Sequence, residues 1–366
     1  MQPTPKARDL SLDLLKATAI FLVVFFHNMQ LNPDSIADNL FMMIGNAAVP
    51  CFFTASGAVF FHRPLSMKKQ IRRILQVYGV MVIWRSIYLL LYLQWGAPWN
   101  GSLRSLCSYL FFFQSMDGIG TAHFWFMDAL LAVMLAAPLL YLCYHGTADY
   151  LPPSRLLPGH STLLVFIMGI LLLFNQGPAV GNLLLSGFSR LIGKPAPDIS
   201  ALAEINPFSF RYSNYMTYYL LGALLTEYKK QISGKTAAIF TGGGILGLML
   251  IKYCQTGSFC WNNIHLSGGY YWLSTMCLTA GLFLLFTRIP VQRWPVTSWI
   301  ARVVGASTLG IFYLHIPLIY VLTPRFTQIA AWNSWLLNTA ESFLIILLAL
   351  IIIWIGRKIP LIRTLF

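Results

Sequence analysis

Three ionisable side chains interrupt the first apolar segment of the chain, residues 13–31. His27 follows Lys16 by eleven residues, close to three turns of an α-helix, and Asp13 precedes Lys16 by about one turn. All three therefore project from one face of a helix whose other faces carry Leu, Ile, Val and Phe. Histidine exchanges a proton near neutral pH and lysine supplies positive charge, so the spacing predicts a chemically active face.

A plainer interpretation fits the same spacing. Asp13 and Lys16 would lie at the inner membrane interface as anchors, and His27 would lie at the outer interface. A charge near the middle of a membrane costs about 2.5–3.5 kcal/mol on insertion scales. That cost favours the interpretation in which this face is turned into a helix bundle.

The composition excludes a soluble domain. Of the 366 residues, 57% are hydrophobic and only 10% are charged, and the mean hydropathy is +0.66. Too little polar surface remains to cover a soluble protein, so we predict an all-α polytopic membrane protein embedded in a lipid bilayer. The formal net charge of +14 does not indicate nucleic acid, because the Lys and Arg residues fall in short segments between apolar runs.

Ten apolar runs are candidates for membrane crossings. Together they predict one transmembrane domain, 1–366, without an appended soluble domain. We expect no cleavable signal peptide, because the first run carries charges and lacks a small-residue cleavage site. A further apolar stretch, 104–113, is too short to cross and is predicted to be an interfacial helix. The ten runs are 11–31, 40–62, 74–95, 122–144, 161–176, 213–228, 236–254, 269–287, 304–323 and 337–356.

Loop charge decides between ten crossings and eleven. With ten, the main basic clusters fall on one side, and the positive-inside rule makes that side cytoplasmic together with both termini. Counting 104–113 as an eleventh crossing would divide these clusters between the two sides. The clusters include Lys6 and Arg8, the residues of KKQIRR, Lys229, Lys230 and Lys235, Arg288, Arg293 and Arg302, and Arg357 and Lys358.

Further polar residues interrupt the apolar runs. Because an unpaired polar group is expensive in hydrocarbon, several together predict a polar interior, although each alone fits a satisfied core residue. We take Arg85 as a candidate for cosubstrate binding. The candidates for substrate binding or structural support are His123, Trp125, Asp128, Glu227 and His315.

The predicted inner loop KKQIRRIL carries a compact cationic cluster. Its members are Lys68, Lys69, Arg72 and Arg73. Such a cluster suits the phosphates of a 3′-phospho-ADP group, with Arg making forked contacts and Lys acting as a point charge. The same residues would also serve to fix topology or to bind anionic lipid.

The outer side offers two further features. The longest predicted outer loop, about 177–212, is expected to form an ordered lid or an acceptor-binding element. Cys254 and Cys260 either close a small disulfide loop or remain free thiols. No Cys or His spacing typical of a metal site is present, so no metal is predicted.

Six stretches, in order along the whole chain, carry a resemblance to a known family. They are LDLLKATAIFLVVFFH, VPCFFTASGAVFF, KKQIRRIL, HFWFMDALL, YMTYYLLGALL and STLGIFYLHIPL. The chain resembles the acyltransferase-3 family of integral-membrane O-acyltransferases, which modify bacterial cell-surface polysaccharides and related molecules. The resemblance implies a ten-helix domain of the bacterial inner membrane. It also implies transfer of an acyl group, usually acetyl, from cytoplasmic acetyl-CoA to a hydroxyl of a glycan or lipid-linked sugar at the outer face.

The resemblance also assigns roles to residues. His27 stands in the place of the catalytic base and Lys16 in that of its basic partner. Lys69 and Arg72 match a basic-x-x-Arg pattern usually written with two arginines, and Lys69 is a departure from it. At the family's Ser-Gly turn, here Ser56 and Gly57, close helix packing is favoured over nucleophilic catalysis.

The resulting hypothesis makes His27 the general base that removes the acceptor's hydroxyl proton as the oxygen attacks the thioester. Lys16, held by Asp13, and Arg85 would supply positive charge along the route or to the oxyanion. A covalent acyl-histidine intermediate is the competing mechanism. An exporter of polysaccharide or lipid intermediates, without acyl chemistry, is the competing function, although no inverted repeat supports it. The sequence leaves open the acceptor, the acyl length and the oligomeric state.

Overall fold

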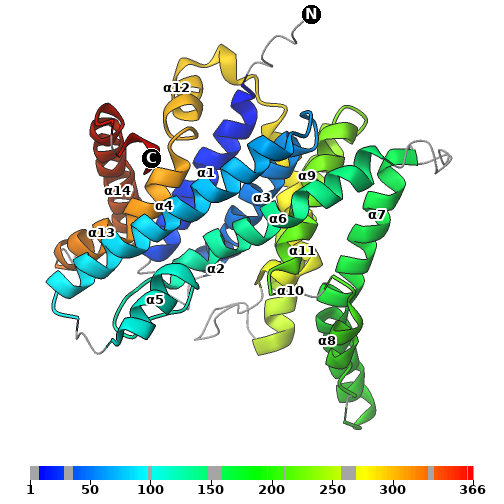
Figure 1. Ribbon diagram of the computed structural model, residues 1–366. Helices are drawn as coiled ribbons and strands as arrows, with labels where there is room; N and C mark the ends of the chain where they lie inside the picture. The colour runs from blue at the N-terminus through cyan, green and yellow to red at the C-terminus, as the bar shows by residue number, and fades with distance from the viewer. Residues whose placement is uncertain are drawn as a thin grey trace, which may run out of the picture.

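The computed structural model describes residues 8–28, 36–97, 101–146, 159–195, 197–208, 211–256, 269–328, 334–360 and 362–365. Within these ranges the chain is helical and contains no strand, as the sequence predicts. Figure 1 shows a bundle in which α1 lies near the centre and α7 and α8 form an arm at one edge. The start of α1 and the end of α14 both lie in the upper part of that view.

The described residues contain fourteen α-helices. Their bounds are α1 Leu10–His27, α2 Ile36–Gly45, α3 Ala48–Phe60, α4 Met67–Gln94, α5 Leu103–Phe111, α6 Trp125–His145, α7 Gly159–Leu171, α8 Gly177–Ile192, α9 Ser213–Tyr228, α10 Gly234–Thr256, α11 Leu273–Phe286, α12 Pro295–Val303, α13 Thr308–Phe326 and α14 Ser334–Lys358. Short 3₁₀ segments include η1 Ala122–Phe124 and η3 Ser200–Ile205.

Eight helical segments among the described residues are long and apolar enough to cross a membrane. The two other predicted runs, 213–228 and 269–287, correspond to α9 and α11, which have 16 and 14 residues. Every residue of α9 from Ser213 to Leu225 is buried, so this short helix is enclosed by its neighbours. The protein is thus an all-helical polytopic membrane protein, and its ten predicted runs all coincide with helices.

The prediction of a long outer loop at 177–212 is wrong. Residues 177–192 form α8, which continues from α7 through a π-helical turn at Leu172–Gln176. Pro178 lies in the first turn of α8, where a missing N–H is tolerated, so it does not end the helix. The 3₁₀ segment η3 occupies part of the remainder. In Figure 1 the α7–α8 arm extends past the rest of the bundle.

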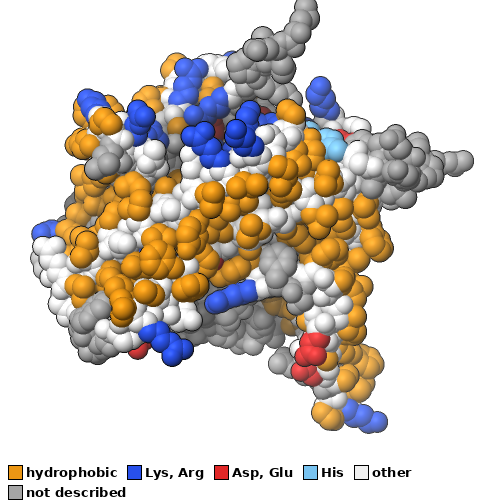
Figure 2. All heavy atoms as spheres, viewed as in Figure 1, with side chains coloured by type: hydrophobic (Ala, Val, Ile, Leu, Met, Phe, Trp, Pro, Cys, Tyr) orange, Lys and Arg blue, Asp and Glu red, His pale blue; other side chains and the backbone are white. Residues whose placement is uncertain are grey.

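The interpretation of KKQIRRIL as an inner loop is also wrong. Helix α4 begins at Met67, so the stretch forms its first two turns. Lys and Arg are good helix formers and no Gly or Pro separates them from the apolar run, so the helix continues beyond it. The four basic side chains of the stretch are exposed. Figure 2 shows Lys and Arg gathered at this end of the molecule above an apolar belt, which matches the predicted orientation.

Two prolines explain how α4 is fixed in the bundle. Proline has no N–H, so Pro138 in α6 and Pro317 in α13 each leave the carbonyl four residues earlier without its helical partner. Those carbonyls belong to Met134 and Tyr313. Gln70 Nε2 of α4 donates to the Met134 oxygen at 2.8 Å, and the Tyr88 hydroxyl of α4 donates to the Tyr313 oxygen at 2.9 Å. Neighbouring side chains thus satisfy groups that lipid could not.

Helices α3 and α9 cross at backbone contact. A Cβ added at Gly57 would lie 1.9 Å from the backbone oxygen of Tyr219, and one added at Gly222 would lie 1.9 Å from that of Thr54. Only glycine fits such an approach, as in other membrane helix pairs with small residues at their interface. The predicted packing role of Gly57 agrees with this geometry, and Ser56 beside it is only partly buried.

We expect Gly57→Ala to separate these helices and to lower the free energy of unfolding by about 1–3 kcal/mol. Gly79→Ala on α4 is the matched control, because no atom lies within 4 Å of its added Cβ. The thermal midpoint of the purified protein in detergent measures both variants. An unchanged midpoint for Gly57→Ala would show that the crossing does not limit stability.

Candidate active site

Three histidines from different parts of the chain meet inside the bundle. His27 is the last residue of α1, His123 lies in η1 before α6, and His315 lies within α13. The ring centroid of His27 lies 4.9 Å from that of His315 and 6.4 Å from that of His123, and the rings of His123 and His315 are 5.4 Å apart. His27 is therefore turned toward other helices and not toward lipid.

One hydrogen bond decides which nitrogen of His27 can act as a base. Nδ1 lies 2.8 Å from the backbone oxygen of Val23. A carbonyl oxygen can only accept, so Nδ1 carries the ring proton. In the neutral imidazole, Nε2 then carries the lone pair, as a general base requires.

His315 has the same tautomer. Its Nδ1 lies 2.5 Å from the backbone oxygen of Phe312 and must donate to it. Its Nε2 is fully buried and has no hydrogen-bond partner. A second imidazole lone pair thus lies beside His27.

His123 has the opposite tautomer. Its Nε2 lies 3.1 Å from the hydroxyl of Tyr88. The single hydroxyl proton of Tyr88 goes to the Tyr313 oxygen that Pro317 leaves free, so the imidazole must be the donor in this contact. The lone pair of neutral His123 therefore lies on Nδ1.

The three histidines differ in how far they are buried by the rest of the protein. His123 is 6% exposed and His315 is 0% exposed, whereas the His27 side chain is exposed. His27 is thus the most exposed of the three histidines.

Asp13 and Lys16 form an ion pair at the other end of α1. Lys16 Nζ lies 2.7 Å from Asp13 Oδ1, and Arg8 pairs with the same carboxylate. The Asp13 side chain is 5% exposed and that of Lys16 is 28% exposed. The predicted pairing of these residues agrees with the structure, but eleven residues of helix put Lys16 about 16 Å from His27.

Arg85 is held by backbone groups. Its Nη1 donates to the oxygens of Tyr109 at 2.9 Å and Gln114 at 3.2 Å, and the Tyr109 hydroxyl donates to the Arg85 oxygen at 3.0 Å. Its Nη2 lies 3.8 Å from a carboxylate oxygen of Asp128. These contacts attach α5, the predicted interfacial helix, to α4.

Asp128 lies among charged and aromatic neighbours at the start of α6. Burial, together with the Asp128 carboxylate, raises the pKa of Tyr212, which immediately precedes α9. Trp125 lies one turn earlier and contacts the rings of Tyr215 and Tyr270, with centroids 5.3 and 5.6 Å away. The start of α6 thus joins the histidine cluster to an aromatic surface of α9.

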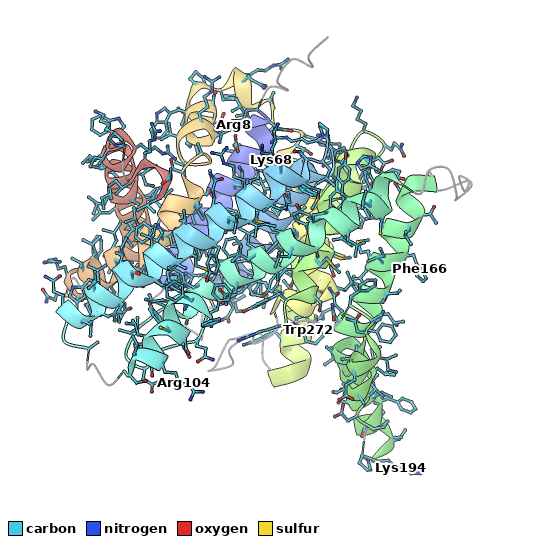
Figure 3. All side chains as sticks on the ribbon, viewed as in Figure 1. Arg8, Lys68, Arg104, Phe166, Lys194 and Trp272 are labelled. Atoms are coloured by element: carbon cyan, nitrogen blue, oxygen red, sulfur yellow. The ribbon has the colours of Figure 1, made fainter. Side chains whose placement is uncertain are left out.

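Two other predicted groups lie apart from the histidines. Glu227, near the end of α9, accepts hydrogen bonds from Tyr144 at 2.8 Å and Ser161 at 2.9 Å, which ties α6, α7 and α9 together. The basic cluster of Lys68, Lys69, Arg72 and Arg73 lies on the exposed first turns of α4. Figure 3 shows Lys68 and Arg8 at one end of the bundle and Arg104 at the other.

Sequence reasoning missed Tyr88 and the role of Pro317. The signal was present, because a proline within a membrane helix always frees the carbonyl four residues before it. What supplies the missing donor depends on the packing of α4 against α13 and cannot be read from the sequence.

No group of three or more His, Cys, Asp or Glu residues with metal-binding geometry occurs in the part of the chain that the structure describes. Cys260 and the side chain of Cys254 lie outside the described residues, so the structure does not test whether the two cysteines form a disulfide or are free thiols.

The sequence model of one family, described as an acyltransferase domain, matches residues 9–357. The chain belongs to the acyltransferase-3 family. This match covers almost the whole chain and makes the protein a multi-pass membrane acyltransferase. Comparisons with characterised proteins and with solved structures give no significant match.

We expect Tyr88→Phe to leave both the Tyr313 oxygen and His123 Nε2 without a partner and to cost about 1–3 kcal/mol of stability. Tyr78→Phe is the control, since that hydroxyl of α4 makes an exposed hydrogen bond to Phe111. Adding Pro317→Ala to Tyr88→Phe restores an N–H four residues after Tyr313. Thermal midpoints of the four proteins in this double-mutant cycle should show a smaller loss in the double variant, and strictly additive losses would contradict the proposed carbonyl contact.

Proposed function

We propose that this acyltransferase moves an acetyl group from acetyl-CoA, bound from the cytoplasm, to a hydroxyl of a cell-surface glycan or lipid-linked sugar. The reaction would take place in the bacterial inner membrane. The observation that carries the proposal is the exposed His27, whose Nδ1 is engaged by Val23 and whose Nε2 is therefore free to accept a proton. The family match supports the acyl chemistry.

His27 Nε2 would remove the proton of the acceptor hydroxyl as its oxygen attacks the thioester carbonyl. General-base assistance of this kind contributes about 10²- to 10⁴-fold to a rate. The C–O bond forms, the C–S bond breaks with its electron pair on sulfur, and His27 returns the proton to the thiolate. Direct transfer needs no covalent intermediate, and retention of acetyl label on the protein would instead support the acyl-histidine mechanism.

The nucleotide of acetyl-CoA would bind at the basic cluster on the first turns of α4. Two Lys and two Arg side chains are exposed there and free to contact phosphates. From that end, the pantetheine arm would reach inward to His27 at the far end of α1.

The position of Lys16 narrows its role. It pairs with Asp13 about three turns from His27, so it is too far away to stabilise the oxyanion directly. We therefore propose that the positive charge of Lys16 acts along the path by which acetyl-CoA reaches the site. Arg85 donates to two backbone oxygens, which suits it to shaping the site.

We expect His27→Ala to abolish label transfer from radiolabelled acetyl-CoA to acceptors in membrane vesicles from the producing cells. The lost base predicts a fall of at least about 10²-fold. His62→Ala is the control, because that histidine lies after α3 and outside the cluster. Full activity of His27→Ala would remove His27 from the mechanism, and acceptor movement without consumption of acetyl-CoA would favour an exporter.

We expect Lys69→Ala combined with Arg72→Ala to raise the KM for acetyl-CoA about tenfold or more with a smaller effect on kcat, since charge-assisted phosphate contacts each contribute about 1.5–3 kcal/mol. Lys230→Ala combined with Lys235→Ala removes the same charge from exposed positions on the same predicted side. Initial rates at varied acetyl-CoA measure both. Equal effects of the two pairs would indicate a general field and not a nucleotide site.

A further inference from the structure

The three histidine rings share a property that a single general base does not require. Each gives its N–H to a group outside the cluster: His27 to Val23, His315 to Phe312 and His123 to Tyr88. When all three are neutral, each ring therefore has an unprotonated nitrogen, and no N–H remains for any other ring in the cluster. The neutral cluster can therefore accept a proton at any of its three rings.

His315 is the ring placed to share that proton with His27. A hydrogen bond of about 2.8–3.0 Å between two imidazole nitrogens puts the ring centres about 5 Å apart. The centroids of His27 and His315 are 4.9 Å apart, whereas His27 and His123 are separated by 6.4 Å. Of the two pairs, only His27 and His315 have the ring separation that such a bond requires.

The burial of His315 supports the same conclusion. Its Nε2 is enclosed and has no partner, which costs about 1–3 kcal/mol for a polar group. A proton carried by His27 would supply the missing hydrogen bond. The hydrogen bond between the two rings is thus strongest when His27 is protonated. Protonated His27 is the state that needs stabilisation during the reaction.

Resting on the proposed function, we propose that His315 is a positioning residue that holds the proton removed by His27. The proton passes from the acceptor oxygen to His27 Nε2 and is held in an N–H···N hydrogen bond to His315 Nε2. It then passes from His27 to the sulfur of CoA as the C–S electron pair arrives there. One imidazolium is formed and consumed in each turnover, so protons and electrons balance without a further reactant.

His123 provides the matched comparison. It belongs to the same cluster and is buried to a similar degree, but Tyr88 engages its Nε2, so its lone pair lies on Nδ1, and its ring is farther from His27. Glutamine at position 123 retains an N–H for Tyr88. Glutamine at position 315 retains a polar side chain but cannot share a proton.

The test compares His315→Gln, His315→Ala and His123→Gln with the unmodified protein, each reconstituted full-length and supplied with radiolabelled acetyl-CoA and vesicles from the producing cells. We expect His315→Gln to lower kcat about 10- to 100-fold and to leave the KM for acetyl-CoA unchanged. Added imidazole should restore part of the rate of His315→Ala by occupying the vacated space. We expect His123→Gln to lower kcat less than His315→Gln does, because the His123 ring is farther from His27.

Full kcat in His315→Gln would overturn the proposal, as would equal losses at 315 and 123 without imidazole rescue. Thermal midpoints identify any variant that fails to fold. If His315→Gln fails to fold, the rescue of His315→Ala by imidazole tests the proposal instead, and a lack of rescue counts against proton sharing. Failure of the proposed function has a different signature, because the unmodified protein would then consume no acetyl-CoA.

Discussion

Two backbone carbonyls without helical partners, at Met134 and Tyr313, are the constraint on which the arrangement of the bundle depends. Hydrocarbon offers them no donor, so side chains of α4 must supply one, and this fixes α4 against both α6 and α13. The consequence reaches the active site. Because Tyr88 gives its proton to the Tyr313 oxygen, it can only accept from His123, and the tautomer of that histidine is set by a proline two residues beyond His315.

The cost of an unpaired polar group in hydrocarbon also explains why the ionisable residues lie close together. A polar side chain facing lipid would cost several kcal/mol, so α1, α4, α6 and α13 turn theirs toward one another. The result is two polar regions on α1, an ion pair around Asp13 in its first turn and the exposed His27 at its last residue. Such a separation suits a reaction whose donor and acceptor arrive from opposite sides.

Much of this arrangement could be predicted from the sequence. Composition and apolar runs were sufficient for the helical class and the ten segments, and spacing was sufficient for the shared face of Asp13, Lys16 and His27. The errors at 177–212 and at KKQIRRIL arose from bounding the helices by their apolar runs, 161–176 and 74–95, whereas the helices continue through Pro178 and through the run of charges. The contact between His27 and His315 could not be predicted, because it depends on how α1 packs against α13 across almost the entire chain.

The most direct test is an experimental structure of the protein in a lipid bilayer with a non-hydrolysable acetyl-CoA analogue bound. The account predicts the nucleotide phosphates against Lys69 and Arg72, and the acetyl carbonyl beside His27 Nε2. A nucleotide bound at the opposite end of the bundle, or a His27 ring facing lipid with no contact to the acetyl group, would contradict it.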